Sequence, residues 1–291
     1  MTNPHDLKSQ LGTVAAQPMT LPLRSLPLSR LGRRWTGLAL LACALGVLSG
    51  CFPIGNASVP IPTALISAPH PAQRLVVFLP GRGDDLAGLG KSGIAQIIQR
   101  EWPDADVELA GLTMAYYTDG QSTRRLHDEV MVPALKRGYR EIWLAGTSLG
   151  GMGALTYSRD YPGEIYGMLL LAPYLGDGSI TREIVKAGGL AQWNPGPPET
   201  LSPQTWQREL WRYLKSWSGD PARTRHVWLA YGDHDRLRPE IELLSPVLRR
   251  THVFVLPGGH SWDVWKVAAP TMLRAATADA ATAPAHAQSG Q

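Results

Sequence analysis

A serine between two glycines is the most chemically suggestive feature of the chain. Residues 146–150 read Gly-Thr-Ser-Leu-Gly and stand between an apolar run, 141–145, and a segment of helical character. A sharp turn that lifts the Ser148 hydroxyl above a sheet leaves no room for side chains two residues away, which gives the glycines a physical purpose. The motif predicts a nucleophilic serine at the start of a helix, whose amino terminus faces the negative charge that develops on the substrate. A glycine-rich loop with a serine that does no chemistry would have the same sequence pattern.

A serine hydroxyl needs two partners, because it is a weak nucleophile at neutral pH. It requires an adjacent base, and the base requires an acid that fixes its tautomer. Residues 226–231 run into Gly-Asp-His-Asp at 232–235, and residues 251–256 run into Pro-Gly-Gly-His at 257–260. Each group follows an apolar run and would therefore lie at the carboxyl end of a strand, where the serine also lies. His260 is the predicted base.

Other histidines and a second aspartate compete for these roles. His226 and His252 open their apolar runs and would fall at the opposite end of a parallel sheet, whereas His234 is interpreted as a surface or pocket-edge residue. Asp233 and Asp235 both follow the same run. The one that is not catalytic has the ordinary role of an aspartate in a turn, which hydrogen-bonds its own backbone.

The elements that position these residues form an alternating pattern. Short apolar runs occupy residues 74–79, 106–110, 141–145, 166–172, 226–231 and 251–256, and helical segments occupy residues 92–102, 122–138, 149–160, 240–249 and 262–276. This alternation predicts an α/β fold, a mostly parallel sheet with helices on both faces. Such a sheet binds ligands at the carboxyl ends of its strands, where the candidate residues stand.

The chain order Ser148, Asp235, His260 resembles the α/β-hydrolase superfamily of serine esterases and lipases, from about residue 72 to 275. The resemblance implies that the acid is Asp235, because the family acid commonly stands three residues after the glycine that ends its strand, here Gly232. The complete set argues against an idle serine.

The same resemblance assigns an oxyanion hole. It implies backbone amides from Leu149 and from the loop after residues 74–79, where alignment of Gly81 with the family glycine selects Arg82. Pro80 replaces the histidine common in the family. Asp84 and Asp85 have metal-ligand chemistry but no accompanying cluster, so no metal and no cofactor is expected.

A long connection, residues 173–225, contains Trp193, Trp206, Trp211 and Trp217. In the family an insertion at this place is usually a cap over the active site, and its aromatic residues would suit an apolar acyl or aryl group. The alternative is a helix whose Trp206, Leu210, Leu214 and Trp217 form a stripe that packs on the sheet. The sequence supports both interpretations equally.

The amino-terminal 50 residues have the order of a secretory signal. Three arginines precede the uncharged run 35–50, which ends in Leu-Ser-Gly before Cys51 and resembles the lipobox of bacterial lipoproteins. We expect cleavage before Cys51, lipidation of its thiol and a cell-envelope location, in the outer membrane if the source is Gram-negative. The alternatives are an uncleaved membrane anchor and an ordinary secretory signal with a coincidental cysteine. Met19 is an alternative start. Residues 51–72 are interpreted as a tether, 73–276 as the hydrolase domain and 277–291 as a disordered tail.

The charge balance excludes nucleic-acid binding. Five of the 28 basic and one of the 24 acidic residues lie in the first 51, which leaves 23 of each in the mature chain. The sequence pI of about 9.1 therefore reflects the export signal. The only cysteines, Cys43 and Cys51, leave the folded domain without an internal disulfide.

Hydrolysis of a carboxylic ester through an acyl-enzyme is the leading functional prediction, with a small-molecule ester or acyl substrate and a membrane contact through the lipid. Thioester or amide hydrolysis and acyl transfer would use the same residues. A non-catalytic binding lipoprotein on this fold is the alternative from another functional class.

Overall fold

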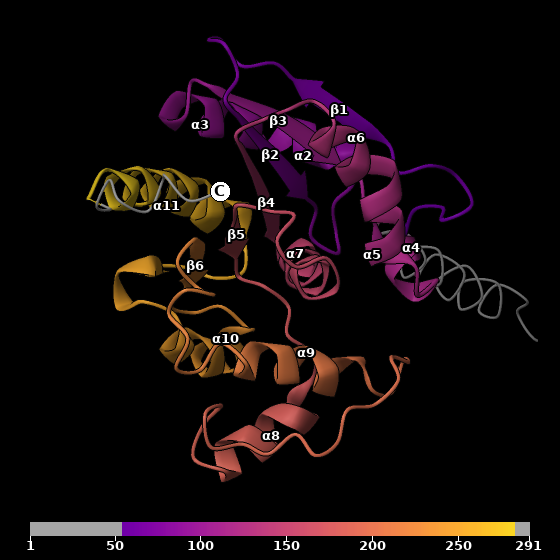
Figure 1. The fold of residues 1–291 in the computed structure, drawn as a ribbon, viewed down its shortest axis with the longest axis vertical. Coiled ribbons are helices and arrows are strands. Elements are labelled where there is room, and N and C mark those ends of the chain that lie inside the picture. Colours follow the sequence, from indigo (N-terminus) through magenta and orange to yellow (C-terminus); the bar gives the residue numbers. More distant parts are fainter. Residues whose placement is uncertain (1–53, 283–291) are drawn as a thin grey trace, which may run out of the picture. The chain divides into compact units, whose positions relative to one another are not determined.

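The computed structural model describes residues 54–282, which build one seven-stranded sheet in the order β1-β3-β2-β4-β5-β6-β7 (Figure 1). β1 runs antiparallel to β3, and every other neighbouring pair is parallel. The strands are β1 (Thr63–Ile66), β2 (Arg74–Leu79), β3 (Ala105–Ala110), β4 (Glu141–Thr147), β5 (Gly167–Leu171), β6 (Val227–Gly232) and β7 (Val253–Leu256). The predicted α/β class is confirmed.

The central strands are buried on both faces, which explains why they read as continuous apolar runs. β2, β4 and β5 are adjacent, and their registers pair Leu79 with Gly146 and Thr147 with Leu171. The three strands therefore end at the same edge of the sheet, beside the Ser148 turn.

Helices cover both faces of the sheet. α3 and α11 contact one face, and α7 contacts the other, with α5 beside it (Figure 1). No helix within residues 54–282 is long and apolar enough to cross a membrane. The helices are α2 (Leu86–Ser92), α3 (Ile94–Glu101), α4 (Met114–Thr118), α5 (Ser122–Leu126), the π-helix η1 (His127–Met131), α6 (Val132–Leu135), α7 (Leu149–Asp160), α8 (Gly178–Lys186), α9 (Trp206–Lys215), α10 (Arg238–Leu244), the 3-10 turns η2 (Ser245–Val247) and η3 (Arg250–His252), and α11 (Trp262–Thr282).

Four helical predictions need correction at their bounds. The helix expected at 92–102 is α3, and Gly93, with φ 74°, separates it from α2, which the sequence does not predict. The helix expected at 240–249 is α10, which ends at Leu244 and is followed by the 3-10 turn η2. The helix expected at 122–138 passes through a π-helical turn at 127–131 and ends at Leu135. α11 continues to Thr282, beyond the expected start of the tail at residue 277.

The predicted tether, residues 51–72, is wrong for its second half. Residues 63–66 form β1, an edge strand that pairs with β3 in register from Thr63–Ala110 to Ile66–Val107. The segment before β1 is also bound to the domain, because the Ile61 amide donates to Glu129 at 2.7 Å. The signal segment and Cys51 lie outside the described residues.

The connection 173–225 contains α8 and α9, and α9 packs on α7 and α8. Of the predicted stripe, Leu210, Leu214 and Trp217 are buried, and the half-buried Trp206 packs against the hydrophobic core. The prediction omits Trp211, which is also fully buried and whose indole donates to the Leu175 carbonyl at 3.0 Å.

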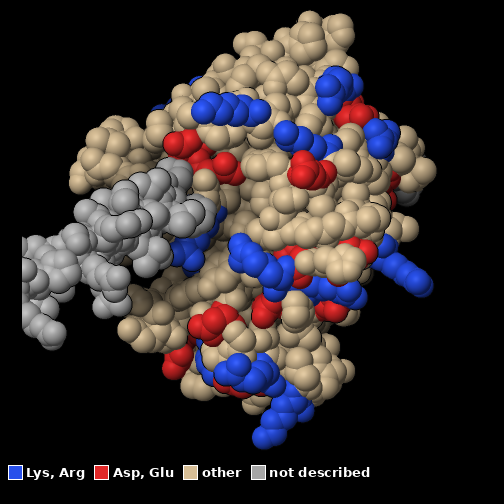
Figure 2. Space-filling model, turned by 180° about the vertical axis from the view of Figure 1, so that it is seen from behind, with Lys and Arg blue, Asp and Glu red and all other residues tan. Residues whose placement is uncertain are grey.

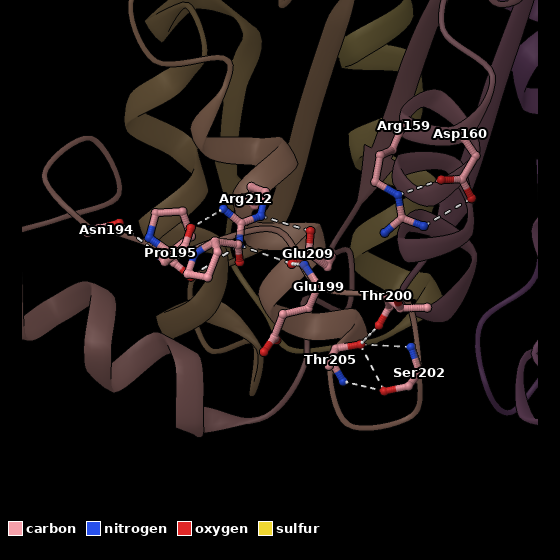
Figure 3. A network of polar contacts seen from close by, with 12 residues as sticks. Arg159, Asp160, Asn194, Pro195, Glu199, Thr200, Ser202, Thr205, Glu209 and Arg212 are labelled. Atoms are coloured by element: carbon pink, nitrogen blue, oxygen red, sulfur yellow. Dashed lines mark hydrogen bonds and ion pairs between the residues drawn. The ribbon is translucent and has the colours of Figure 1, made fainter.

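A polar network fixes the loop before α9 (Figure 3). The Arg212 guanidinium donates to the carbonyls of Gly196 and Pro197 at 2.8 and 2.7 Å and to the Glu209 carboxylate. The second Glu209 oxygen accepts the Glu199 amide at 3.1 Å. This part of the insertion is thus held by hydrogen bonds as well as by apolar packing.

Acidic and basic side chains are interspersed on the face shown in Figure 2, without a broad patch of one sign. A nucleic-acid surface would gather basic residues into a patch or stripe. This face offers none.

Candidate active site

Ser148 occupies a strained turn between β4 and α7. Its φ and ψ are 51° and −112°, a conformation that non-glycine residues seldom adopt, and its residue surface is 5% exposed. Its amide donates to the Leu171 carbonyl at 2.9 Å, and its carbonyl accepts from the Tyr174 amide at 2.9 Å. Two hydrogen bonds to the end of β5 therefore hold the serine in this conformation.

The two glycines of the motif are required by close backbone approach. A Cβ atom on Gly146 would lie 2.5 Å from the carbonyl carbon of Gly150, and a Cβ atom on Gly150 would lie 2.3 Å from the Leu79 oxygen. Side chains at either position would push the helix away from the sheet. The packing therefore requires glycine at the two positions where the motif has it.

His260 and Asp235 lie together at the carboxyl edge, after β7 and β6. The His260 Nδ1 atom lies 2.8 and 2.9 Å from the two carboxylate oxygens of Asp235, whose side chain is fully buried. Asp235 also accepts the Leu237 amide at 2.8 Å, which fixes the carboxylate. The pair holds the proton on Nδ1 and leaves Nε2 to accept.

The His260 Nε2 atom is buried and has no hydrogen-bond partner among residues 54–282. Nor does a hydrogen bond join it to Ser148 Oγ within that part of the chain. Catalytic hydrogen bonds are often long before substrate binds. An unpartnered basic nitrogen in a buried site is what a general base requires.

Asp233 has a different role from Asp235. Its carboxylate accepts the Gly258 amide and contacts His234 Nδ1, each at 2.8 Å, and the Gly258 amide lowers the Asp233 pKa. Asp233 therefore ties the end of β6 to the loop that carries His260. The His234 side chain is 82% exposed.

His226 and His252, the two histidines that the sequence places at the opposite end of the sheet, lie at the amino ends of β6 and β7. His252 is fully buried, stacks on Trp228 and has Nδ1 3.1 Å from the Val227 carbonyl. His226 stacks on Tyr166. Burial lowers the pKa of both imidazoles, which favours their neutral forms.

The two proposed oxyanion donors border Ser148. Leu149 is the first residue of α7, so its amide has no intrahelical partner. Gly81 lies against the serine, since a Cβ atom built on it would be 3.5 Å from Ser148 Cβ, and this places the Arg82 amide nearby.

A contact that sequence reasoning missed joins the Ser148 and His260 sides of the site. The Trp262 indole donates to the Asp84 carboxylate at 2.7 Å, and its ring stacks on Phe78. Asp84 belongs to the loop that touches Ser148, and Trp262 stands two residues after His260. Asp85 instead accepts the Gly88 amide and caps α2. Both aspartates thus have structural partners.

Two surface cavities lie apart from this cluster. One, of about 520 Å³, is lined by residues of the insertion and of α10 and η2, including Trp217 and Leu243. The other, of about 450 Å³, lies between residues 55–62 and the start of α2. Neither is lined by Ser148 or His260.

Comparison with known proteins agrees with the fold and with ester hydrolysis. The Esterase family model, described as "Putative esterase", matches residues 123–276. Est1E from Butyrivibrio proteoclasticus is similar in structure, with a TM-score of 0.53 and 15% identity over 79% of this chain and 98% of that one. A ferulic acid esterase (TM-score 0.50, 16% identity, 72% and 86%) and Mycobacterium tuberculosis MPT51 (0.50, 14%, 73% and 91%) share the fold. No curated protein matches the chain.

Proposed function

The chain belongs to the Esterase family and is a serine ester hydrolase, and from this premise we propose that Ser148, His260 and Asp235 carry out the reaction through an acyl-enzyme. The observation that carries the proposal is the buried Asp235 carboxylate bound to His260 Nδ1, at the sheet edge that also carries Ser148. This arrangement orients an imidazole for proton transfer and stabilises its cationic form.

In the first half-reaction Ser148 Oγ attacks the ester carbonyl carbon and gives its proton to His260 Nε2. The amides of Leu149 and Arg82 bind the oxyanion, and the bond to the alcohol oxygen breaks as the alcohol takes the proton from Nε2. In the second half-reaction water attacks the acyl-enzyme, loses its proton to Nε2 and releases the acid. Ser148 regains its proton from the same nitrogen.

Replacement of Ser148 tests the proposal. Ser148→Ala should fold and bind substrate while turnover of 4-nitrophenyl esters falls by several orders of magnitude, to a level shared by His260→Ala and by the double variant. A fluorophosphonate probe should label wild-type protein and not Ser148→Ala. Near-normal hydrolysis by purified Ser148→Ala would exclude this triad.

We also propose that Cys51 carries a lipid that anchors the enzyme in the cell envelope, in the outer membrane of a Gram-negative source. The support is the order of basic run, uncharged run and Leu-Ser-Gly-Cys in the sequence. Labelled fatty acid should be incorporated into the full-length protein in a bacterial host and not into Cys51→Ser. An unlabelled wild type would refute the anchor.

A further inference from the structure

Two residues with polar side chains, Arg82 and Tyr174, follow the strands on either side of the one that carries Ser148. β2 and β5 are the two neighbours of β4 in the sheet, and adjacent strands lie about 4.8 Å apart. Arg82 comes three residues after the end of β2, and Tyr174 comes three residues after the end of β5. Because the three strands end in register, these two residues bracket the serine.

Backbone contacts fix both residues close to the nucleophile. Gly81, which precedes Arg82, packs against Thr147 and Ser148. The Tyr174 amide donates directly to the Ser148 carbonyl at 2.9 Å, and the Tyr174 ring lies 6.1 Å from that of Trp206, between ring centroids. Movement of either loop would therefore disturb the serine itself.

Both side chains offer hydrogen-bond donors that the described chain leaves free. Arg82 is exposed and pairs with no carboxylate within residues 54–282. The half-buried Tyr174 hydroxyl has no hydrogen-bond partner in the same range. Burial raises the Tyr174 pKa, so the phenol stays protonated, and the charge of Arg82 reaches it.

The carboxylates near Arg82 and Tyr174 are not available as ion-pair partners for Arg82. Asp84 is bound by Trp262, and Asp177 accepts the Ser179 amide as the N-cap of α8. Asp177 and Glu240, which follow β5 and β6 in the chain, both raise the Tyr174 pKa, so negative charge lies near the Tyr174 side of Ser148. A cationic substrate group is therefore the competing possibility.

We propose that Arg82 and Tyr174 bind an anionic group, a carboxylate or a phosphate, that the ester substrate carries a few bonds from its carbonyl. A guanidinium supplies a planar set of donors that fits such a group, and a phenol adds one more. The proposal rests on the assignment of Ser148 as nucleophile and adds a substrate class to it.

The test compares esters that differ only in charge. Full-length protein in detergent is assayed with 4-nitrophenyl butyrate, with butyrate analogues that end in a carboxylate, a phosphate or a trimethylammonium group, and in low and high salt. The variants are Arg82→Gln, Arg82→Lys, Tyr174→Phe and, as a matched loss of charge on α11, Arg274→Gln. The quantity compared is the ratio of kcat/KM between charged and neutral ester, in which any effect on the Arg82 amide cancels.

Wild-type protein should prefer one anionic ester, and high salt should reduce the preference. Arg82→Gln should lower the anionic-to-neutral ratio about tenfold, which corresponds to about 1.4 kcal/mol. Arg82→Lys should keep most of the preference, Tyr174→Phe should lower it about threefold, and Arg274→Gln should leave it unchanged. The carboxylate and phosphate analogues show which anion is preferred.

An unchanged ratio in Arg82→Gln, or a wild-type preference for the neutral or cationic ester, would overturn the inference while Ser148→Ala still abolished turnover. Hydrolysis that survived Ser148→Ala would instead overturn the proposed nucleophile. The two failures are therefore distinguishable in one set of assays.

Discussion

The hydrogen bond between Trp262 and Asp84 is predicted to position the catalytic histidine. Trp262→Phe removes the indole N–H and keeps an aromatic ring, which can still stack on Phe78 at the wild-type centroid distance of 6.2 Å. The bond lost is 2.7 Å long and ends on a carboxylate. The change therefore isolates one donor that spans the two sides of the site.

The expected magnitude follows from the type of bond. Hydrogen bonds to charged groups contribute about 1.5–3 kcal/mol, and the lower end applies here because the half-exposed Asp84 regains water. A loss of about 1.5 kcal/mol lowers Tm by roughly 3–6 °C in a domain of this size. We also expect kcat to fall about tenfold, because displacement of His260 by a fraction of an ångström misaligns proton transfer.

The assay pairs kcat for a 4-nitrophenyl ester with thermal unfolding. Trp102→Phe is the matched control, since its indole also donates one hydrogen bond, to Thr277 Oγ1 at 2.9 Å, near the amino end of β3. It should lose about 1 kcal/mol of stability with kcat unchanged. If Trp262→Phe lost stability but kept kcat within twofold of wild type, the contact would be structural only.

Three further predictions, with four substitutions, test other parts of the site and fold. Asp235→Asn should reduce kcat on the order of 10⁴-fold, because an amide at this position favours the wrong tautomer of His260. Asp233→Asn retains an acceptor for the Gly258 amide and should reduce kcat far less. The reverse ranking would transfer the acid role to Asp233. Gly150→Ala should destabilise the domain by about 1–3 kcal/mol because its Cβ meets the Leu79 oxygen, and a wild-type Tm would contradict this packing. Burial alone would raise the Glu129 pKa, but hydrogen bonds from Arg125 and the Ile61 amide lower it below 4.5. The stabilisation that the ionised Glu129 provides is therefore present above pH 4.5 and is lost as pH falls. The melting temperature of Glu129→Gln should accordingly lie below that of wild type at neutral pH and approach it in acid.

The order of elements was predictable because each central strand is a short apolar run that is followed directly by glycine or proline. β2, β4, β5 and β6 are all within one residue or two of their predicted bounds. Because these strands are buried on both faces, they are continuous apolar runs and do not alternate between apolar and polar residues, which makes them easy to recognise in the sequence. The position of Ser148 follows from the same property, since the motif directly succeeds such a run.

The choice between Asp233 and Asp235 lay beyond composition. Both aspartates stand after β6. Only the fold shows how closely the end of β6 approaches the loop that carries His260: a Cβ atom on Gly232 would lie 2.2 Å from the Gly258 oxygen. At this distance the first aspartate meets the loop backbone and the second reaches the imidazole. Family spacing had selected Asp235 without this physical reason.

The sequence predicts a tether at residues 51–72, and this prediction fails because the partners of the segment are distant in sequence. Residues 57–61 have no periodicity of their own, and their backbone is bound by side chains of α5 and η1: Arg125 donates to the carbonyls of Ala57 and Val59, and Glu129 accepts from Ile61. The same arginine lies over the Tyr116 ring. A proline-rich stretch that reads as a spacer can therefore belong to the fold when charged groups elsewhere satisfy its backbone, and the catalytic domain extends at least from Ile54, whose carbonyl accepts the Ala115 amide at 2.8 Å.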